Sequence, residues 1–305
     1  MKIQVFHSKG GGPGIFMHRL CNYLASHHDV KFVNKNPDIY FSAVWRGAPP
    51  KGCKVVHRVD NCYFDTLQKK RTGSNKAIAL AIKKADGVIY QSDFSRKICK
   101  GILGVKARKY KIIYNAIDQT VCDNIIPINH GFEKIIVSSA IWRPLKRPNA
   151  IIKAFIAAAI PNAALYMIGE LKPIVKSSNI VYVGKIGSEK IYSYYKAATA
   201  MIHISRLDAC SNSVIEALSF GKPVICNNAG GTPEIVKKDG VIINIDPEDN
   251  YREFPMKNPE KVNINTIASG IKECLSKEWN IKRPEFDMSY CASQYYEFFK
   301  EILLK

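Results

Sequence analysis

The sequence predicts a two-domain α/β protein in which each domain contains a parallel β-sheet covered by helices. Short β-branched runs alternate with longer amphipathic runs, which is the pattern of strands joined by helical crossovers. The alternation stops near residues 115–118 and starts again at residue 134. Each half opens with a strand that leads into a glycine-rich or polar loop. A chain of 305 residues also suits two domains of roughly 150 residues each.

The first domain is expected to be Rossmann-like and to cover residues 1–120. Its predicted strands are Ile3–Phe6, Ile39–Ser42, Lys54–His57, Gly87–Tyr90 and Lys111–Tyr114. Its predicted helices, in which apolar residues recur at helical spacing, are Ile15–Ser26, Ser74–Lys84 and Asp93–Lys100. Ser92 precedes the last of these helices and suits its N-cap, because a serine hydroxyl accepts from a free N–H of the first turn.

Residues 121–133 are expected to be a linker, and residues 134–285 a second Rossmann-like domain. Its predicted strands are Lys134–Ser139, Ala164–Ile168, Ile180–Val183, Ala200–Ile204, Val224–Cys226 and Val241–Ile245. A helix is predicted over Asn149–Ala158, and residues 286–305 form an amphipathic helix that ends the chain.

The composition is typical of a packed globular protein. The chain is 47% hydrophobic, and no apolar run approaches the roughly 20 residues that span a bilayer. The opening MKIQVFHSKGGG breaks too early in glycine for a secretory signal and is better interpreted as a strand. Nine cysteines are scattered singly with no C-x-x-C pair, so we expect free thiols, no metal site and a cytoplasmic protein.

The charge is unevenly distributed along the chain. Of a net charge of +19, residues 1–120 contribute +15, because they hold 22 Lys and Arg against seven Asp and no Glu. This asymmetry indicates that the first domain faces an anionic partner. Nucleic acid, an acidic membrane surface and an acidic sugar acceptor are all open, and a merely solvated basic surface is the simplest alternative.

Two carboxylates flank the start of a predicted helix in the stretch RLDACSNSVIEAL. Asp208 precedes small polar residues, and Glu216 follows eight positions later. Ser213 and Glu216 match a capping box, so one interpretation is that Glu216 only caps its own helix. That interpretation leaves Asp208 unexplained. Free N–H groups at a helix start also bind phosphate or sugar oxygens, and two nearby carboxylates can accept bonds from sugar hydroxyls.

Two further candidate loops stand out, one after the first strand of each half. Gly10, Gly11, Gly12 and Gly14 let the backbone approach a ligand, but they fail the dinucleotide G-x-G-x-x-G pattern and lack the G-K-S/T of an NTPase loop. In the second half, the loop SSAIWRPLKRP contains Arg143 and Lys146, cations long enough to reach a diphosphate. Alone, the glycine loop indicates a tight turn as often as a binding site, and two solvated charges are the simpler interpretation of the second loop.

Taken together, these residues resemble family 4 glycosyltransferases, which are retaining enzymes with the GT-B fold. The signature block of that family has two acids with seven residues between them, then E-A-x-x-x-G-x-P-V and G-G-x-P-E, and residues 206–236 match it. The chain departs from the pattern at Asp208, where the first acid is usually Glu, and at Ala209, where Gly is common. VVHRVD, ADGVIYQSDFSRKI, IIYNAID and IWRPLKRPNAIIKAF resemble further family segments along nearly the whole chain.

The resemblance implies two domains facing a cleft that contains the active site, with the final helix crossing back to the first domain. In the second domain it gives Arg143 and Lys146 to the donor diphosphate, although most members place the Arg two residues further from the Lys. Glu216 would accept from the ribose hydroxyls, and Asp208 would contact the donor sugar. The remaining donor-binding residues implied there are Asn212 and Ser213, through the helix start, and Gly184 and Lys185, which would bind the base.

From the first, acceptor-side domain the resemblance implies four residues. Gly11 and Gly12 would approach the diphosphate, and His57 would lie near the donor sugar. Asp60, in the same loop as His57, is an acceptor-side candidate. The alternative for His57 is a structural histidine at a strand end.

The resemblance therefore predicts transfer of a sugar from a nucleoside diphosphate sugar of UDP or GDP type to a hydroxyl of a glycan, glycolipid or similar acceptor, with no cofactor. No metal is expected, because cations and helix N–H groups can balance the leaving diphosphate and no D-x-D motif ends a strand. The alternative is a basic nucleic-acid- or membrane-binding protein with an inactive cleft. The basic half lacks a nucleic-acid module, which disfavours nucleic acid. A peripheral contact with the inner membrane face is left open.

Overall fold

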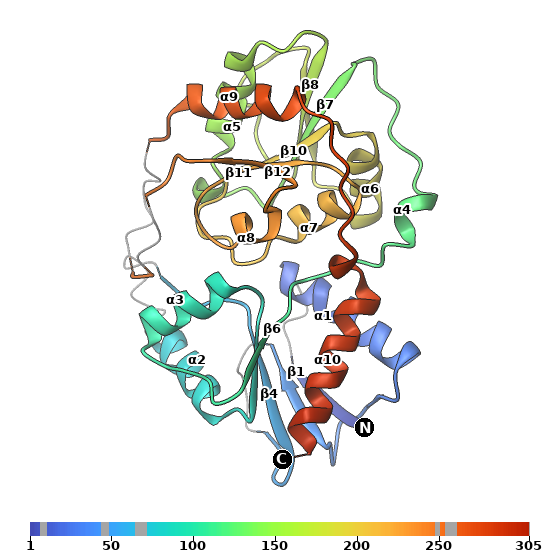
Figure 1. Ribbon diagram of the computed structural model, residues 1–305, viewed down its shortest axis with the longest axis vertical. Coiled ribbons are helices and arrows are strands. Elements are labelled where there is room, and N and C mark those ends of the chain that lie inside the picture. Colours follow the sequence, from blue (N-terminus) through green and yellow to red (C-terminus); the bar gives the residue numbers. More distant parts are fainter. Residues whose placement is uncertain (7–10, 44–48, 65–71, 248–250, 254–260, 305) are drawn as a thin grey trace. The chain divides into compact units, whose positions relative to one another are not determined.

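The computed structural model describes the chain except for residues 7–10, 44–48, 65–71, 248–250, 254–260 and 305. Backbone contacts divide the chain into two units (Figure 1). The first unit contains Met1–Asp118 and Glu285–Lys305, with the short segment around Tyr251, and the second contains Gln119–Asp249 and Met256–Pro284. In the part of the chain that is described, no helix is both long and apolar enough to cross a membrane.

The first unit contains a six-stranded sheet in which every strand pair is parallel. The strands run in the order β2-β1-β3-β4-β5-β6, so the order reverses beside β1. Their bounds are β1 (Lys2–Phe6), β2 (Lys31–Phe32), β3 (Ile39–Ser42), β4 (Lys54–Val59), β5 (Gly87–Tyr90) and β6 (Tyr110–Ile112). β3 and β5 are buried throughout, as strands of a parallel sheet covered on both faces must be.

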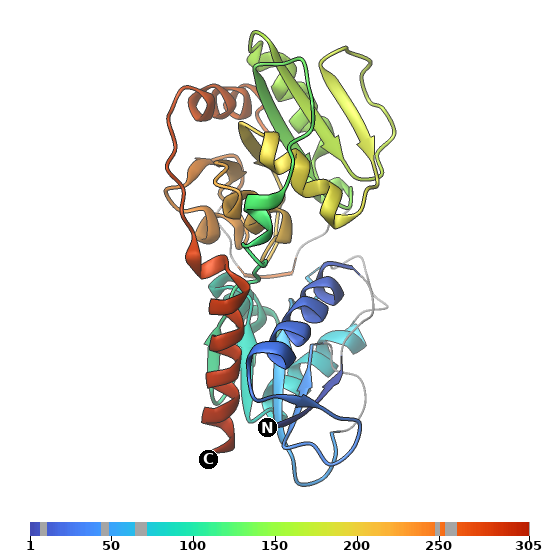
Figure 2. The same cartoon turned by 90° about the vertical axis from the view of Figure 1, so that its right-hand side faces the viewer.

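The helices that pack on this sheet in the described part of the chain are α1 (Gly11–His27), α2 (Thr72–Lys84), α3 (Asp93–Leu103) and α10 (Met288–Leu303). α10 lies beside α1 (Figure 2) and contributes Tyr295, Phe298 and Phe299 to the core of this unit. Ser92 is the N-cap of α3 and accepts from Ser95 N at 3.0 Å, as its sequence predicts.

The second unit also contains a six-stranded parallel sheet. Its order is β12-β11-β10-β7-β8-β9, so the chain winds outward from β7 in one direction and then from β10 in the other. The bounds are β7 (Lys134–Ser139), β8 (Ala163–Ile168), β9 (Ile180–Gly184), β10 (Ala200–His203), β11 (Val224–Asn227) and β12 (Gly240–Ile243). The point where the order reverses, between β7 and β10, is where open α/β sheets bind their ligands.

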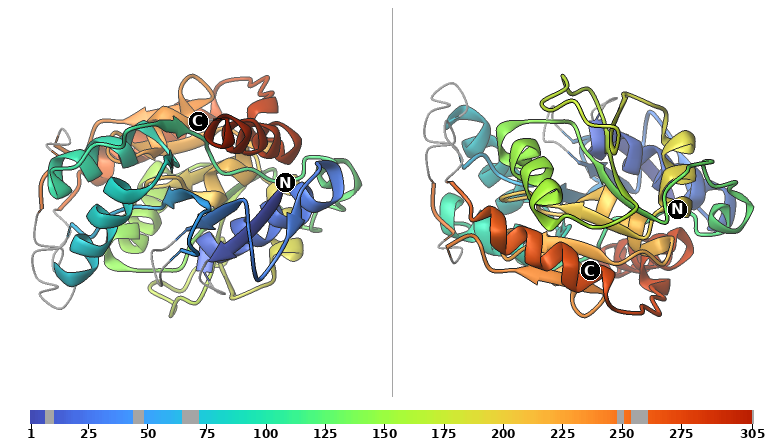
Figure 3. Two further views of the ribbon diagram at one scale, coloured as in Figure 1. Left: turned by 90° about the horizontal axis from the view of Figure 1, so that it is seen from below. Right: turned by 90° about the horizontal axis from the view of Figure 1, so that it is seen from above.

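Helices lie on both faces of this sheet (Figures 1 and 3). α5 (Pro148–Ala158) and α9 (Ile264–Leu275) pack together over one face, in front of the strands in the right-hand view of Figure 3. The other helices of the unit are α4 (Val121–Asn124), α6 (Ser188–Ala197), α7 (Asn212–Ser219) and α8 (Thr232–Val236), and the 3-10 turn η2 (Pro144–Lys146) lies between β7 and α5. A further 3-10 turn, η3 (Pro284–Phe286), lies where the chain passes from the second unit to the first. Of these, α6, α7 and α8 cover the opposite face in Figure 1.

The structure confirms the predicted α/β fold with two parallel sheets, and it corrects several local expectations. α1 begins at Gly11, so Gly11 and Gly12 form the first helical turn rather than a loop before Ile15, and Gly10 lies outside the described residues. β4 continues to Val59, so His57 lies inside a strand and not in the loop that holds Asp60. β2, α4, α6, α8 and α9 have no counterpart among the predicted elements, and α4 falls in the expected linker.

Gly169 shows how closely the end of β8 approaches the β7–α5 loop. Its φ is +118°, and a Cβ built on it would lie 2.1 Å from the carbonyl oxygen of Ala140 and 2.9 Å from Nε1 of Trp142. Only glycine fits both the backbone conformation and the space.

We expect Gly169→Ala to lower the free energy of unfolding by at least about 2 kcal/mol, because the clash with a backbone carbonyl adds to the left-handed strain. Gly131→Ala is the matched control, since a Cβ there meets nothing within 4 Å. It should change stability by less than about 0.5 kcal/mol. Urea denaturation of the two variants measures both effects, and equal stabilities would contradict the packing described.

Candidate active site

The β7–α5 and β10–α7 loops meet where the strand order of the second sheet reverses. β7 and β10 are parallel neighbours, so both loops leave from the carboxyl edge of the sheet. Arg206 N donates to the carbonyl oxygen of Leu145 at 3.1 Å, which ties the two loops together. Polar side chains of both loops are thereby held at one point of the sheet edge, the position at which open parallel sheets bind ligands.

Lys146, Asp208 and His203 form a polar cluster at this point. The Lys146 ammonium contacts Oδ2 of Asp208 directly. Nε2 of His203, the last residue of β10, lies 3.1 Å from the same carboxylate oxygen. The lysine and the aspartate are each about one-fifth exposed, whereas the histidine side chain is buried. One carboxylate therefore orients two nitrogen groups, of which the ammonium remains accessible to a ligand.

The electrostatics of the cluster fix its protonation at neutral pH. Burial raises the pKa of Asp208. The charge of Lys146 and the hydrogen bond from His203 lower this pKa by more than burial raises it, so the pKa of Asp208 is well below the usual range. Burial, followed by the charge of Lys146, lowers the pKa of His203. At pH 7 Asp208 is therefore an anion and His203 is neutral, so the imidazole Nε2–H donates to the carboxylate.

The start of α7 lies next to this cluster and differs from the predicted capping box. The N-cap is Ser211, so Ser213 is the second helical residue and Glu216 the fifth, and the box expected between them is wrong. Ser211 makes no side-chain cap bond, and its hydroxyl lies 2.9 Å from that of Ser213. The first-turn N–H groups, Asn212 and Ser213 among them, have no carbonyl partner earlier in the helix.

Glu216 is a buried residue of α7 in the second unit. It is 8% exposed, and its charge is the second cause, after burial, of the raised pKa of Tyr195 on α6. The Tyr195 hydroxyl also lies near Ser139, the last residue of β7. Glu216 is therefore held within the same group of elements as the Lys146 loop, and it does not project from the helix surface as a solvated charge.

A second polar cluster, which the sequence analysis missed, supports the first. Arg147 donates two hydrogen bonds to Asp246, at 2.8 and 2.5 Å, and Asn227 donates to the same carboxylate at 2.6 Å. Arg206 of the β10–α7 loop lies 3.5 Å from it. No local pattern could have indicated this pairing, because Arg147 and Asp246 are 99 residues apart.

Other candidates lie further from the Lys146–Asp208 pair. Arg143 is exposed and lines an open groove of about 810 Å³ between the β7–α5 loop, the residue 171–174 loop and the start of α9, whereas Lys146 and Asp208 do not line it. Gly184 ends β9 with φ +77°, its carbonyl accepts from Gly169 N at 2.8 Å, and the adjacent Lys185 is exposed. The structure therefore places Lys146 beside Asp208, whereas Arg143 lines a separate groove.

In the first unit, His57 is a buried strand residue. Its Nδ1 lies 2.9 Å from the hydroxyl of Ser42, its register partner on β3. Burial lowers the pKa of His57 to about 4, so the ring is neutral at pH 7. These features match the structural alternative for His57 as well as they match a ligand contact.

Asp60 follows β4 and belongs to a network around a buried arginine. Arg58 contacts Asp60 and donates to Asn115 at 2.6 Å and to the Tyr295 hydroxyl at 3.1 Å. Gln91 donates to Oδ1 of Asp60 at 2.7 Å, whereas Oδ2 of Asp60 is buried and receives no hydrogen bond from the residues that the structure describes. The carboxyl edge of the first sheet thus holds one carboxylate oxygen that is positioned but not satisfied.

The comparison with known families falls on the second unit. Residues 133–254 match the family model described as glycosyl transferases group 1. The matched segment contains Lys146, Asp208 and Glu216, together with Arg143 and the α7 start, whereas His57 and Asp60 lie outside it. The cluster at the reversal of the strand order is therefore the part of the chain that the group 1 pattern covers.

The chain is also similar to individual proteins in sequence and in structure. An uncharacterized 41.2 kDa protein in the cps region of Klebsiella pneumoniae is 24% identical over 212 residues, which are 64% of this chain and 59% of that protein. The alignment thus spans less than two thirds of that relative. Sucrose-phosphate synthase from Thermosynechococcus elongatus has a TM-score of 0.71 at 14% identity, with 99% of each chain covered. Anabaena HepE in complex with UDP has a TM-score of 0.66 at 14% identity, over 99% of this chain and 100% of the other.

At such identities the structural likeness shows the fold, which is that of GT-B glycosyltransferases. The group 1 match is confined to residues 133–254, so it concerns the second unit of this fold. The geometry adds which side chains of the matched segment lie together.

We expect Asp208→Asn to destabilise the protein by about 1–3 kcal/mol at pH 7, because it removes the partly buried partner of Lys146. A carboxylate with a lowered folded-state pKa contributes stability above its unfolded pKa of roughly 4 and loses it as the pH falls further. The gap between the two proteins should therefore narrow from pH 5 to pH 2 in denaturant titrations. Asp29→Asn, which removes an exposed carboxylate, is the control, and a gap that is constant with pH would contradict the assignment.

Proposed function

We propose that the chain is a retaining, metal-independent glycosyltransferase that moves a sugar from a nucleoside diphosphate sugar to an acceptor hydroxyl. The observation that carries this proposal is the Lys146–Asp208–His203 cluster beside the α7 start, inside the segment that matches group 1 glycosyl transferases. It combines a cation for a diphosphate with a fixed carboxylate for a sugar hydroxyl.

In this proposal Lys146 binds the donor diphosphate. When the bond between the anomeric carbon and the phosphate oxygen breaks, negative charge develops on the leaving nucleoside diphosphate. The ammonium of Lys146 and the backbone N–H groups of Asn212 and Ser213, at the start of α7, stabilise that charge without reorganising, because Asp208 and the helix already hold them in place. Arg143 would add a second cation, but its exposure at the separate groove makes Lys146 the principal one.

Asp208 would accept from a hydroxyl of the donor sugar, and Glu216 from the ribose hydroxyls. Since His203 donates to one oxygen of Asp208, the other oxygen is left to point toward the sugar. The acceptor hydroxyl attacks the anomeric carbon on the face from which the phosphate leaves, and its proton passes to the departing phosphate oxygen. Configuration is then retained, and no protein nucleophile or metal ion is needed.

The donor base and the acceptor side are less constrained. The complexes of HepE with UDP and with UDP-glucose favour a UDP-type donor here, and GDP remains the alternative. Gly184 and Lys185 would contact the base. From the first unit, Gly11, Gly12 and His57 are proposed for the donor and Asp60 for the acceptor hydroxyl, whose donor hydrogen would satisfy the unpaired Oδ2. A glycan or glycolipid acceptor and a peripheral membrane contact are proposals of the same kind.

The first prediction concerns binding. UDP, GDP or another nucleoside diphosphate should raise the melting temperature of the protein without added metal, because a ligand of the folded state stabilises it by mass action. Lys146→Gln should abolish most of this rise, whereas Lys190→Gln, an exposed lysine on α6, should keep it. A thermal-shift screen that shows no rise with any nucleoside diphosphate would contradict the proposal.

The second prediction concerns turnover. Glu216→Gln should lower the transfer rate at saturating acceptor by about a hundredfold or more. Its far-ultraviolet circular dichroism spectrum should stay that of the unmodified protein. Glu278→Gln removes an exposed carboxylate from the same unit and should leave the rate unchanged. Release of nucleoside diphosphate measures both, and near-normal transfer by Glu216→Gln would overturn the role given to that residue.

A further inference from the structure

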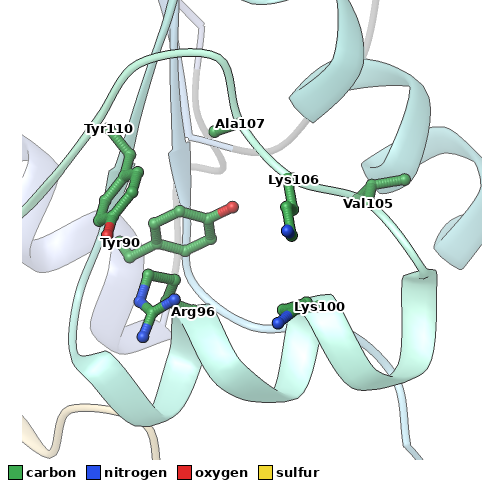
Figure 4. A pocket seen from close by; sticks show the side chains of 7 residues that line it. All are labelled: Tyr90, Arg96, Lys100, Val105, Lys106, Ala107 and Tyr110. Carbon is green, nitrogen blue, oxygen red and sulfur yellow. The ribbon is translucent and has the colours of Figure 1, made fainter.

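A second polar pocket lies in the first unit, between α3, the following loop and the edge of the sheet. It has a volume of about 270 Å³ and is lined by Tyr90, Arg96, Lys100, Val105, Lys106, Ala107 and Tyr110 (Figure 4). Tyr90 ends β5 and Tyr110 begins β6, whereas the basic residues come from α3 and from the loop after it. No residue of the polar clusters described above lines this pocket.

The polar groups of this pocket are available to a ligand. The Lys100 and Lys106 ammoniums have no ion-pair or hydrogen-bond partner among the residues that the structure describes. The Tyr90 side chain is only 2% exposed, and within the same described set its hydroxyl makes no hydrogen bond. Figure 4 shows that this hydroxyl points into the pocket, toward the side where Lys106 lies. A ligand oxygen in the pocket can therefore accept a hydrogen bond from this hydroxyl.

The net charge at the pocket is positive. Asp93 pairs with Arg96, with a nitrogen–oxygen distance of 2.7 Å, and also with Lys97, so it offsets only one of the nearby cations. The C-terminal end of α3 adds a partial negative charge of roughly half an elementary charge, which is smaller than the positive charge of the Lys100 and Lys106 ammoniums. Arg96 also lies over the ring of Tyr110, 5.6 Å from its centroid, so the guanidinium is held against the pocket wall.

The shape and the donors favour one ligand chemistry. A cavity of about 270 Å³ lies below the roughly 300–1,000 Å³ of sites that enclose a whole drug-sized molecule, so it suits a small group. Two ammoniums, a guanidinium and a phenol hydroxyl match the three terminal oxygens and the near-dianionic charge of a phosphate monoester better than the two oxygens of a carboxylate.

We propose that this pocket, Tyr90–Arg96–Lys100–Lys106, is a binding site for a phosphate monoester group, separate from the donor site. The group belongs either to a membrane lipid headgroup or to a soluble phosphorylated molecule. Either source agrees with the basic bias of residues 1–120, to which the three cations of this pocket belong. The inference stands independently of the proposed transferase function.

In the test, inorganic phosphate is titrated into the 305-residue protein and the heat of binding is measured by calorimetry. A titration with sodium chloride at equal ionic strength is the control. Tyr90→Phe removes only the hydroxyl, and Lys106→Gln removes one exposed charge. Each should weaken phosphate binding by roughly tenfold. Lys83→Gln is the matched control, an exposed lysine on α2 outside the pocket. Absence of phosphate binding, or equal weakening in all three variants, would overturn the proposal, because the latter is the signature of diffuse surface charge.

Vesicles distinguish the two sources. Sedimentation with phosphatidylcholine vesicles that contain phosphatidic acid, a monoester, is compared with vesicles of equal charge that contain phosphatidylglycerol, a diester. Loss of binding to the phosphatidic acid vesicles alone in Tyr90→Phe and Lys106→Gln supports the site and assigns it to a lipid. Weakened inorganic phosphate binding with unchanged vesicle binding supports the site and assigns it to a soluble phosphate monoester.

Discussion

The second unit depends on a buried ion pair between Arg147 and Asp246. Asp246 is fully buried, which would cost several kcal/mol for an unpaired carboxylate, and its oxygens are instead satisfied by the Arg147 guanidinium and by Asn227. The pair joins the start of α5 to the segment after β12, and Arg206 connects it to the β10–α7 loop. Because Arg147 directly follows Lys146, fixing its guanidinium also fixes the backbone from which Lys146 reaches Asp208. A buried structural pair thus positions an accessible cation.

The first unit uses the same device with a different outcome. Arg58 is fully buried and distributes its donors among Asn115, the Tyr295 hydroxyl and Asp60, while its guanidinium carbon lies 4.6 Å from the centroid of the Phe16 ring. Tyr295 comes from α10, so the final helix of the chain contributes to the network at the carboxyl edge of the first sheet. In each unit a buried arginine contacts a carboxylate near the end of a strand, Asp60 in the first unit and Asp246 in the second. The arrangement concentrates polar chemistry at the strand ends while the sheet interiors stay apolar.

Parts of the candidate site could be predicted from the sequence, for a physical reason. Asp208, Glu216 and Lys146 lie in short loops or at a helix start next to strands, and the hydrophobic periodicity of those strands determines where the loops fall. His203 was missed, because a histidine that ends an apolar strand has no local pattern that separates a core residue from a partner of Asp208. Ser213 was misplaced as an N-cap, since the capping-box spacing was present while Ser211, two residues earlier, begins the helix in space.

The sequence by itself determined the α/β class, the two parallel sheets, most strand bounds to within two residues and the concentration of positive charge in the first 120 residues. These properties follow from local periodicity and composition, which every segment carries alone. Only the tertiary structure decided that Arg147 is buried against Asp246 while Lys146 pairs with Asp208 and stays partly exposed, that Arg143 lines a different groove, and that Tyr90 and Lys106 share a pocket. Neighbouring cations in one loop look alike in the sequence. Which of them pairs with a carboxylate depends on which distant segments the fold brings to that loop.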